Sequence, residues 1–350
     1  MNGKFVNKEL NKILLQEEFT KDDIVYLLSL EDEKSIEILF ARADKIRKLY
    51  CDDEVHLRGV IEFSNFCEEN CMYCGLRKDN EKVPRYRMRP DEIIETAKRI
   101  ANQGIHTIVL QSGQDFYFDS DMISFLIYSI KNDCDVAITL SLGERSFEEY
   151  KAWKIAGADR YLLKHETSNP HHFSIYHDKQ KLSTRLEHLK YLKKIGYQVG
   201  SGNMIGLPLQ TIEDIADDIL LCKELNIDMA AFGPFIPSPD TPYQNKSAGN
   251  AVLTLKAMAV IRIVLKDVHI PATTALDTIE TKGREKGLRA GANVLMPNFT
   301  PNPYRDQYQI YPTSVRKDLD PSLSGIRMQN RIESIGRKVS QSKGDSLKMY

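Results

Sequence analysis

The chain has almost no excess of charge of either sign, which argues against a nucleic-acid partner. Lysine and arginine together number 48, against 49 aspartate and glutamate residues, for a formal net charge of −1 at pH 7. No block of basic residues is interleaved with aromatic residues. Proteins that bind phosphate backbones need such a basic surface. DNA or RNA binding therefore has no electrostatic support in this sequence.

Long hydrophobic runs and a signal-like beginning are also lacking. The most apolar stretches, such as Ile100–Leu110, are broken by polar residues. None of them approaches the roughly 20 apolar residues that span a bilayer. The stretch Met1–Leu10 carries charges of both signs and has no apolar core of a signal peptide. We therefore expect a cytoplasmic protein without a membrane partner.

Cysteine is scarce except at one place. The chain has six cysteines, and three of them, Cys67, Cys71 and Cys74, lie within eight residues. A secreted disulfide scaffold would be short and dense in cysteine, and this chain is neither. Clustered thiols in a reducing compartment indicate a metal site. The isolated Cys134 and Cys222 lie near apolar stretches and are expected to pack in the core.

A regular alternation of short apolar runs and amphipathic stretches fills the middle of the chain. Helical patterns between the apolar runs are typical of crossovers between parallel strands. Eight such units favour a closed barrel over a doubly wound sheet, since no GxGxxG turn follows a strand. We predict an α/β fold, a (βα)8 TIM-type barrel with an N-terminal helical extension. The predicted strands are Leu57–Phe63, Thr107–Leu110, Val136–Leu140, Arg160–Leu163, Gln198–Ile205, Met229–Phe232, Ile270–Thr273 and Asn293–Met296.

The two ends of the chain differ from the alternating part. Residues 1–50 predict two or three helices, and residues 51–312 the barrel. Residues 313–350 are expected to form a partly irregular C-terminal segment with one helix near Ser324–Ile335. The tail from Val339 onwards looks weakly ordered, because it is polar and lacks periodicity.

The three clustered cysteines follow the first predicted strand in a CxxxCxxC pattern, with Tyr73 before the last one. Barrel enzymes build their active sites on loops at this end of the strands. The spacing lets one loop wrap a 4Fe–4S cluster and bind three of its irons through thiolates. Structural zinc would need a fourth tetrahedral ligand, and no nearby Cys or His provides one. We predict one 4Fe–4S cluster held by Cys67, Cys71 and Cys74.

Three protein ligands leave one iron of the cluster open. The amino and carboxylate groups of S-adenosylmethionine (SAM) can chelate that iron. An electron from the reduced cluster then breaks the S–C5′ bond and gives a 5′-deoxyadenosyl radical, so the cofactors carry the difficult chemistry while the protein orients them. The cysteine pattern on a barrel is identified as that of the radical SAM superfamily.

Residues at the ends of the other strands are candidates for binding SAM. The turn Gln111-Ser112-Gly113 lies where superfamily members commonly bind the methionyl ammonium group. Glu166 and Arg185 offer charges of opposite sign to the zwitterionic methionine portion, although a plain ion pair is an alternative for Arg185. The glycine-rich stretch Gly200–Pro208 would form a flat wall for adenine. The expected cofactor-binding residues are Tyr73, Gln111, Ser112, Gly113, Ser141, Glu166, Arg185 and Met204.

Hydroxyl groups beyond the last two strands are candidates for binding a substrate. Thr273 and Thr274 follow the seventh predicted strand, and Tyr304 lies beyond the eighth. A role in the core or in a loop fits these residues nearly as well.

Several segments together resemble the HydE family of radical SAM maturases of FeFe hydrogenase. The likeness runs from about residue 20 to residue 312. Its clearest stretches are Ile61–Asn65, Cys74–Asn80, Arg85–Met88, Thr107–Gly113, Thr139–Glu144, Gly157–Leu163, His165–Thr167, Gly233–Pro237, Pro239–Pro242, Pro271–Ala275 and Gly291–Asn298.

The resemblance implies both a reaction and its partners. The adenosyl radical would attack the sulfur of a cysteine-bound iron carbonyl cyanide unit made by the partner maturase HydG, and HydF would serve as the assembly scaffold. A reductant such as ferredoxin or flavodoxin would supply electrons. Thr139, Lys164, Thr273, Thr274 and Tyr304 would fall at substrate or anion sites of an internal cavity.

Three departures from the family pattern accompany the likeness. Many members have a second cysteine triplet after the position of Tyr311, but Tyr311–Arg337 contains no cysteine. Gln114 stands where an acidic residue is typical, and Lys164 where arginine is typical. Lysine keeps the positive charge but cannot make the two parallel hydrogen bonds of an arginine. The polar end of the substrate is therefore expected to differ from that of other members. The alternatives are a methylornithine synthase-like enzyme that acts on an amino acid and a non-catalytic metal-binding scaffold.

Overall fold

Parallel strands joined by helices make up most of the computed structural model, which describes residues 2–312 and 320–348. The strands are β1 (Glu54–Leu57), β2 (Gly59–Ser64), β3 (Thr107–Ser112), β4 (Ala137–Ser141), β5 (Arg160–Leu162), β6 (Gln198–Ser201), β7 (Met204–Ile205), β8 (Met229–Ala230), β9 (Gly233–Pro234), β10 (Val294–Leu295) and β11 (Lys338–Val339). The helices are α1 (Asn2–Leu14), α2 (Lys21–Leu28), α3 (Glu33–Cys51), α4 (Pro90–Ala101), α5 (Ser120–Asp133), α6 (Phe147–Ala156), α7 (Pro170–Tyr176), α8 (Leu182–Lys194), α9 (Ile212–Glu224), α10 (Ala251–Leu265), α11 (Thr274–Ile279), α12 (Gly283–Arg289), α13 (Tyr304–Gln307) and α14 (Ser324–Glu333), with a short 3-10 turn, η2 (Pro321–Leu323).

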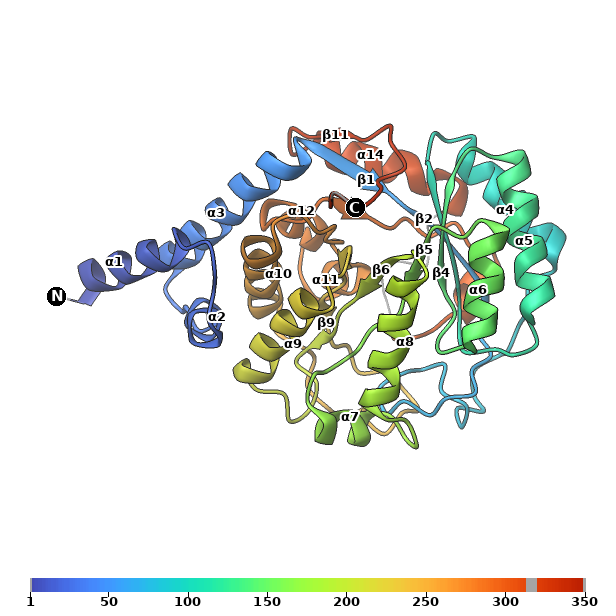
Figure 1. The fold of residues 1–350 in the computed structure, drawn as a ribbon, viewed down its shortest axis with the longest axis horizontal. Helices are drawn as coiled ribbons and strands as arrows, with labels where there is room; N and C mark the ends of the chain where they lie inside the picture. Colours follow the sequence, from blue (N-terminus) through green and yellow to red (C-terminus); the bar gives the residue numbers. More distant parts are fainter. Residues whose placement is uncertain (1, 313–319, 349–350) are drawn as a thin grey trace.

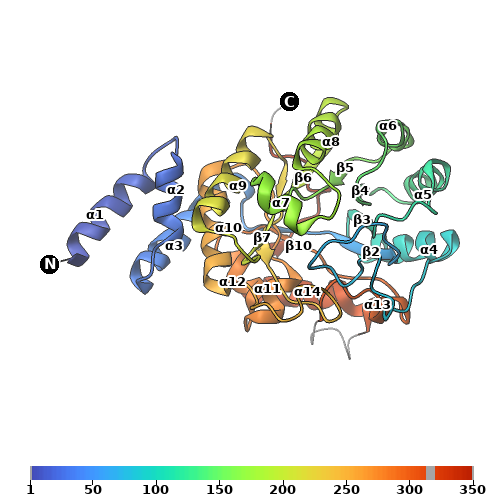
Figure 2. The same ribbon diagram turned by 90° about the horizontal axis from the view of Figure 1, so that it is seen from below.

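The strands close into a ring. Six of them form a parallel sheet in the order β2-β3-β4-β5-β6-β8. Isolated parallel bridges complete the circle, from Met229 to His269, from Pro271 to Val294, and from Asn298 back to Val60. Helices α4, α5, α6 and α8 cover one side of the ring, and α9 and α10 cover the other (Figures 1 and 2). The predicted (βα)8 TIM-type barrel is confirmed.

Three predicted strands differ from the observed ones. The run Leu57–Phe63 is two strands, since β1 pairs with β10 and β11 whereas β2 pairs with β3. The run Gln198–Ile205 is interrupted near Gly202, where a Cβ atom would lie 2.2 Å from the carbonyl oxygen of Ala231. The run Ile270–Thr273 makes only a bridge, because Pro271 has no N–H for a ladder and Thr273 already caps α11.

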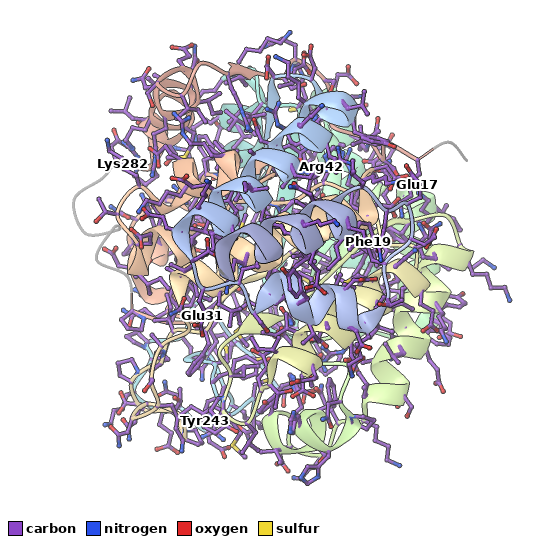
Figure 3. The ribbon with its side chains drawn as sticks, turned by 90° about the vertical axis from the view of Figure 1, so that its left-hand side faces the viewer. Glu17, Phe19, Glu31, Arg42, Tyr243 and Lys282 are labelled. Carbon is purple, nitrogen blue, oxygen red and sulfur yellow. The ribbon has the colours of Figure 1, made fainter. Side chains whose placement is uncertain are left out.

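The predicted N-terminal helices are present and lie against the outer side of the barrel. Thr20 caps α2 in a capping box with Asp23, and Asp32 caps α3. Helices α2 and α3 pack on α10, which is buried along most of its length. Figure 3 shows this face, with Arg42 on α3 and Phe19 in the loop between α1 and α2.

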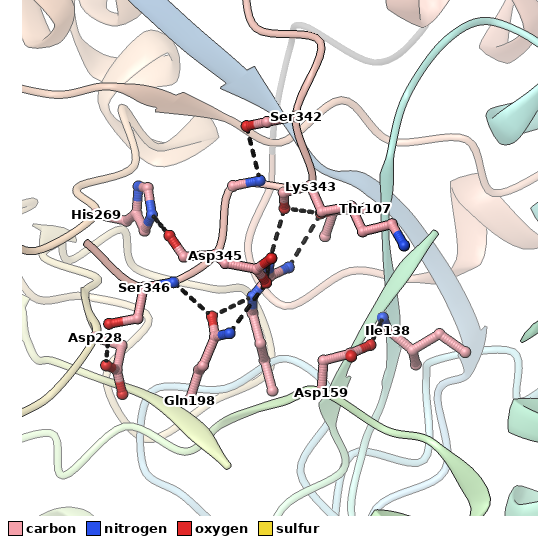
Figure 4. Close-up of polar contacts among 12 residues, drawn as sticks. Thr107, Ile138, Asp159, Gln198, Asp228, His269, Ser342, Lys343, Asp345 and Ser346 are labelled. Carbon is pink, nitrogen blue, oxygen red and sulfur yellow. Dashed lines mark hydrogen bonds and ion pairs between the residues drawn. The ribbon is translucent and has the colours of Figure 1, made fainter. Parts of the chain in front are cut away.

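The C-terminal tail closes the base of the barrel. Strand β11 pairs with β1, and the segment beyond it crosses the amino-terminal ends of the strands (Figure 4). The Gly344 carbonyl accepts a hydrogen bond from buried Arg58 at 3.2 Å, and the Lys343 carbonyl accepts one from Arg160 at 2.8 Å. Two buried guanidinium groups need acceptors there, and the tail backbone provides them. The expected weak order of the tail is therefore wrong for residues 339–348; residues 349 and 350 lie outside the described part.

The opposite end of the barrel carries the loops that follow the strands. Helix α7 lies at that end, and the C-terminal tail at the other (Figure 1). Across residues 2–312 and 320–348, every helix is too short or too polar to cross a bilayer.

Candidate active site

The cysteine loop starts directly after β2 and is held by its neighbours rather than by secondary structure. Buried Asn65 accepts a hydrogen bond from the Tyr86 N–H at 2.7 Å and donates to the carbonyls of Pro84 and Gln307. The Arg85 guanidinium donates to four carbonyl groups, those of Asn65, Leu76, Arg77 and Asn80. These contacts tie the stretch after Cys74 to the stretch Arg85–Met88 and fix the shape of the loop.

The three thiols are crowded and partly buried. Burial raises the pKa of all three, and charge on a neighbouring sulfur raises those of Cys71 and Cys74 further, the latter to about 12. Backbone N–H groups work in the opposite direction: those of Glu69 and Gln114 favour the thiolate of Cys67, and that of Leu76 favours Cys74. Such a site needs a bound cation to keep its sulfurs as thiolates.

A histidine that the sequence did not indicate lies beside the cysteines. His177, the residue after α7, places Nδ1 3.3 Å from the Cys71 sulfur and Nε2 3.3 Å from the Tyr73 hydroxyl. Burial and then the charge of Arg185 lower the pKa of His177 far below its usual value. Tyr73 itself packs with Tyr176, Phe235 and other apolar residues and lines the cavity described below.

The turn after β3 makes close contact with the cysteine loop. A Cβ atom on Gly113 would lie 2.1 Å from the Phe66 carbonyl oxygen and 2.8 Å from the Cys67 Cβ, so only glycine fits. The Ser112 hydroxyl donates to the carbonyl of Gly113 at 2.6 Å. Gln111 reaches the cavity wall, where its side chain donates to the Tyr308 hydroxyl.

Gln114 explains one departure from the family pattern. Its amide donates to Glu69 on the cysteine loop at 2.7 Å and accepts from the Glu144 N–H at 2.8 Å. The pKa of Glu69 is already raised, first by burial and then by the charge of Glu144. A carboxylate at position 114 would add a third negative charge, so the neutral amide fits this chain.

Arg185 is held by the protein on two sides. Its guanidinium forms an ion pair with Glu144, beyond β4, and donates to the carbonyl of Lys164 at 2.6 Å. An ion pair was the alternative that the sequence left open for Arg185. The structure shows such a pair, and it is buried rather than at the surface. Ser141 lies at the carboxyl end of β4, only partly buried, on the strand that leads to Glu144. Glu144 was not expected at the site, because nothing in its spacing marks it.

Glu166 has the least usual backbone in the region. Its φ angle is +65°, and its N–H donates to the Gly202 carbonyl at 2.9 Å. A left-handed non-glycine residue persists only where its surroundings impose it, typically at functional sites. Its Oε2 atom is buried, lies 3.4 Å from Lys164 Nζ, and makes no hydrogen bond to any described residue. Both side chains line the cavity, as does Met204 of β7.

A cavity of about 590 Å³ occupies the barrel interior on this side. It extends from Tyr73 and Glu166, next to the cysteine loop, to residues of α14. Thr273 and Thr274 line it, and each of their hydroxyl groups already accepts a hydrogen bond. Thr273 accepts from the Leu276 N–H at 3.3 Å, and Thr274 accepts from the Arg284 guanidinium at 2.7 Å.

Arg284 is a second residue that the sequence did not indicate. Its side chain is buried at the cavity wall, 4.0 Å from Asp277, and its Nε has no partner among the described residues. Burial lowers the pKa of Arg284 to about 10, although Asp277 opposes this. Arg284 thus contributes a guanidinium group to the cavity wall, with the Asp277 carboxylate beside it.

Two expected substrate residues lie elsewhere. Thr139 lines a separate small pocket at the base of the barrel, because it sits in the middle of β4 rather than at its carboxyl end. Tyr304 packs its ring against Tyr86, and its hydroxyl donates to Glu92 of α4. Arg305 and Tyr311 line the cavity in this region instead.

The donor set fits a 4Fe–4S cluster with SAM beside it. Thiolates are the ligands that such irons take, and N–H groups directed at the sulfurs usually accompany them. In the part of the chain that the structure describes, no three His, Cys, Asp or Glu side chains are arranged to hold a single metal ion. The Glu166 oxygen without a hydrogen bond, facing the cavity, is an acceptor of the kind that a polar cofactor satisfies.

Comparison with known proteins agrees with this geometry. The family model of the radical SAM superfamily matches residues 61–222. The chain is 49% identical to the [FeFe] hydrogenase maturase subunit HydE of Thermotoga maritima over 350 residues, 98% of each chain. It is 29% identical to 3-methylornithine synthase of Methanosarcina acetivorans over 286 residues, 81% of each chain.

Solved structures show the same fold. Methylornithine synthase (PylB) superposes with a TM-score of 0.83 at 25% identity, over 95% of this chain and 97% of that one. The maturase HydG superposes with a TM-score of 0.80 at 19% identity, over 98% of this chain and 77% of that one. With nearly half of its residues identical to HydE along almost the full length of both chains, the chain belongs to the HydE family of radical SAM enzymes, which use a 4Fe–4S cluster and SAM.

Proposed function

We propose that Cys67, Cys71 and Cys74 hold a single 4Fe–4S cluster, with SAM bound between the cysteine loop and the adjoining cavity. When bound and reduced, such a cluster supplies the electron that cleaves SAM and starts radical chemistry. The observation that carries the proposal is the position of three partly buried thiols on one loop, beside a cavity whose wall includes Glu166 with its left-handed backbone.

The surroundings of the cavity support specific roles toward SAM. We assign the polar methionine portion to Gln111, to the Ser112–Gly113 turn, to Ser141 and to the pair Glu166 and Arg185, since these offer backbone and side-chain groups of both charges. Tyr73 and Met204 provide apolar contact area beside them. Arg185 would act with its charge partly balanced by Glu144, because the two already form an ion pair.

The substrate we propose is a cysteine-bound iron carbonyl cyanide unit, as a family member would receive from a HydG-like partner and pass on toward a HydF-like scaffold. The identity with HydE supports this choice, together with the Arg284 guanidinium in the cavity wall. Lys164, Thr273 and Thr274 would contact it. Because Thr274 already accepts from Arg284, its own hydroxyl proton is available to an acceptor on the substrate.

The proposal also includes the cellular compartment and the electron donor. The enzyme would work in the cytoplasm with a ferredoxin- or flavodoxin-like reductant. Neither nucleic acid nor membrane enters the reaction, in keeping with the near-zero net charge of the chain.

Anaerobic reconstitution with iron and sulfide, followed by dithionite and SAM, tests the first part. The wild type should release 5′-deoxyadenosine, whereas Cys71→Ala should release none. Cys222→Ala, which removes a fully buried thiol of α9, is the matched control and should keep the activity. Equal loss in both variants, with the fold intact, would contradict the ligand assignment.

Activation of apo-hydrogenase tests the substrate. The protein should support activation together with HydG and HydF, and Cys71→Ala should not. If SAM cleavage is intact but activation fails, the alternative is an amino-acid substrate, as the likeness to 3-methylornithine synthase suggests. Incubation with lysine and analysis of the products would then reveal a rearranged amino acid.

A further inference from the structure

His177 links two residues of the cysteine loop. It follows α7 on a different part of the barrel, and its backbone N–H donates to the Phe173 carbonyl at 2.9 Å. The ring stacks on Phe173 at 4.4 Å between centroids and meets the Tyr73 ring edge-on at 5.6 Å. Only 2% of the residue is exposed. Packing thus holds the imidazole with one nitrogen at the Cys71 sulfur and the other at the Tyr73 hydroxyl.

The two contacts define where the ring proton lies when iron is bound. A sulfur that ligates iron is a thiolate and has no proton to donate. Nδ1, 3.3 Å from that sulfur, must then carry the proton. With a single proton on the ring, Nε2 is then an acceptor, and the Tyr73 hydroxyl, 3.3 Å away, donates to it. The result is one directed chain from the tyrosine hydroxyl through the imidazole to the sulfur.

We propose that His177 is a positioning residue of the cluster: it donates its Nδ1–H to the Cys71 thiolate and holds Tyr73 through Nε2. This rests on the proposed cluster. Cys67 and Cys74 receive their hydrogen bonds from backbone N–H groups, but the donor to Cys71 is a side chain, so substitution can remove it. A hydrogen bond to a ligating sulfur stabilises the more negative, reduced cluster and raises its reduction potential.

Two isosteric substitutions separate the two contacts. In His177→Asn the amide nitrogen can occupy the place of Nδ1, so the donor to Cys71 remains while the contact to Tyr73 is lost. In His177→Gln the longer side chain puts its amide near the place of Nε2, so the Tyr73 contact remains and the Cys71 donor is lost. Tyr73→Phe removes only the tyrosine hydroxyl.

Redox titration of the reconstituted proteins, followed by electron paramagnetic resonance, is the test. His177→Gln should lower the ratio of reduced to oxidised cluster about tenfold at a fixed potential, a negative shift of about 59 mV for a one-electron couple. His177→Asn and Tyr73→Phe should titrate with the wild type. A shift shared by all three variants, or absent from His177→Gln, would overturn the proposal.

A measurement on the wild type does not depend on any variant folding. Protein labelled with 15N-histidine and reduced should show a weak 15N coupling to the cluster in pulsed resonance spectra, and Tyr73→Phe should retain it. A loaded wild-type cluster without this coupling would refute the hydrogen bond alone. A wild type that binds no cluster would instead refute the proposed function.

Discussion

The carboxylate of Asp115 accepts two hydrogen bonds from the guanidinium of Arg87, at 2.8 and 2.9 Å, and a third from the Ser64 hydroxyl at 2.6 Å. Ser64 ends β2, and Asp115 follows β3, so one carboxyl group joins three segments at the root of the cysteine loop. Arg87 also lies over the Phe66 ring at 3.7 Å from its centroid. Arg87 therefore links this junction to Phe66, the residue before Cys67.

Asp115→Asn should weaken this junction. The Asp115 side chain is 3% exposed but that of Arg87 is 32% exposed, so breaking this pair should cost about 2 kcal/mol, less than a fully buried one. We expect a lower free energy of unfolding by roughly this amount and a lower iron content after reconstitution. Chemical denaturation and iron analysis measure the two effects. Glu18→Gln, at an exposed ion pair with Lys223, should change stability by less than about 0.5 kcal/mol.

The same junction predicts a pH dependence. Burial acts to raise the pKa of Asp115, but hydrogen bonds from Arg87 and Ser64 outweigh it, so the folded-state pKa lies below 3.8. A depressed carboxyl pKa gives stability that is present above the unfolded pKa and is lost as the pH falls through the folded pKa. The difference in unfolding free energy between wild type and Asp115→Asn should therefore be constant near neutrality and shrink below about pH 4. A difference that persists at pH 2 would contradict the assignment.

Gly113→Ala should displace the cysteine loop. The added methyl group would lie 2.1 Å from the Phe66 carbonyl oxygen, so the backbone has to move. We expect loss of cluster binding and a destabilisation of about 1–3 kcal/mol from overpacking. The control is Gly104→Ala, where the Cβ meets nothing within 4 Å and only the φ angle of +72° is unfavourable. It should cost about 1 kcal/mol and leave the iron content unchanged.

Glu166→Gln should weaken SAM binding without loss of the cluster. The amide keeps the shape of the side chain but removes the charge beside Lys164. A hydrogen bond to a charged group contributes about 1.5–3 kcal/mol, so the dissociation constant for SAM should rise by roughly 10- to 150-fold. Equilibrium binding to reconstituted protein measures it, with Glu148→Gln at an exposed position of α6 as the control. Unchanged affinity would place SAM away from Glu166.

Asp345→Asn should loosen the C-terminal tail only slightly. The Asp345 carboxylate pairs with buried Arg160 at 2.7 Å but is itself 62% exposed. Arg160 keeps its acceptors on Gln198, Thr107 and Lys343, so a cost of about 1 kcal/mol is expected. Removal of residues 340–350 should cost several times more, because Arg58 and Arg160 both lose carbonyl partners. Equal costs for the two changes would argue against the tail as the closure of the barrel base.

The barrel and its cysteine loop were predictable because they depend on local patterns. Strand runs, helix caps such as Thr20, and the spacing of Cys67, Cys71 and Cys74 can be found within a few residues of one another. His177 lies 106 positions after Cys71, and no short motif connects them. Arg284 meets Thr274 only because α12 folds back on α11.

The direction in which a side chain points was the second property that could not be predicted from the sequence. Thr139 lies on the correct strand, but its depth in β4 directs it to the base of the barrel. Tyr304 directly precedes Arg305, which lines the cavity, yet the Tyr304 hydroxyl donates to Glu92 of α4 instead. The order of the tail was not predicted because the buried arginines at the barrel base bind its backbone carbonyls, which every residue has and no side-chain pattern marks.

The burial of α10 determines how the protein can be divided. This helix is mostly apolar, and residues 254–265 are all buried, partly beneath α2 and α3. Lys256 extends its ammonium group to the Leu30 carbonyl at 2.7 Å. A fragment that began after α3 would expose the apolar surface of α10 to water and would be prone to aggregate. A shortened variant that is to keep the barrel folded therefore has to retain the first three helices. They cover one face of the barrel and are part of its packing.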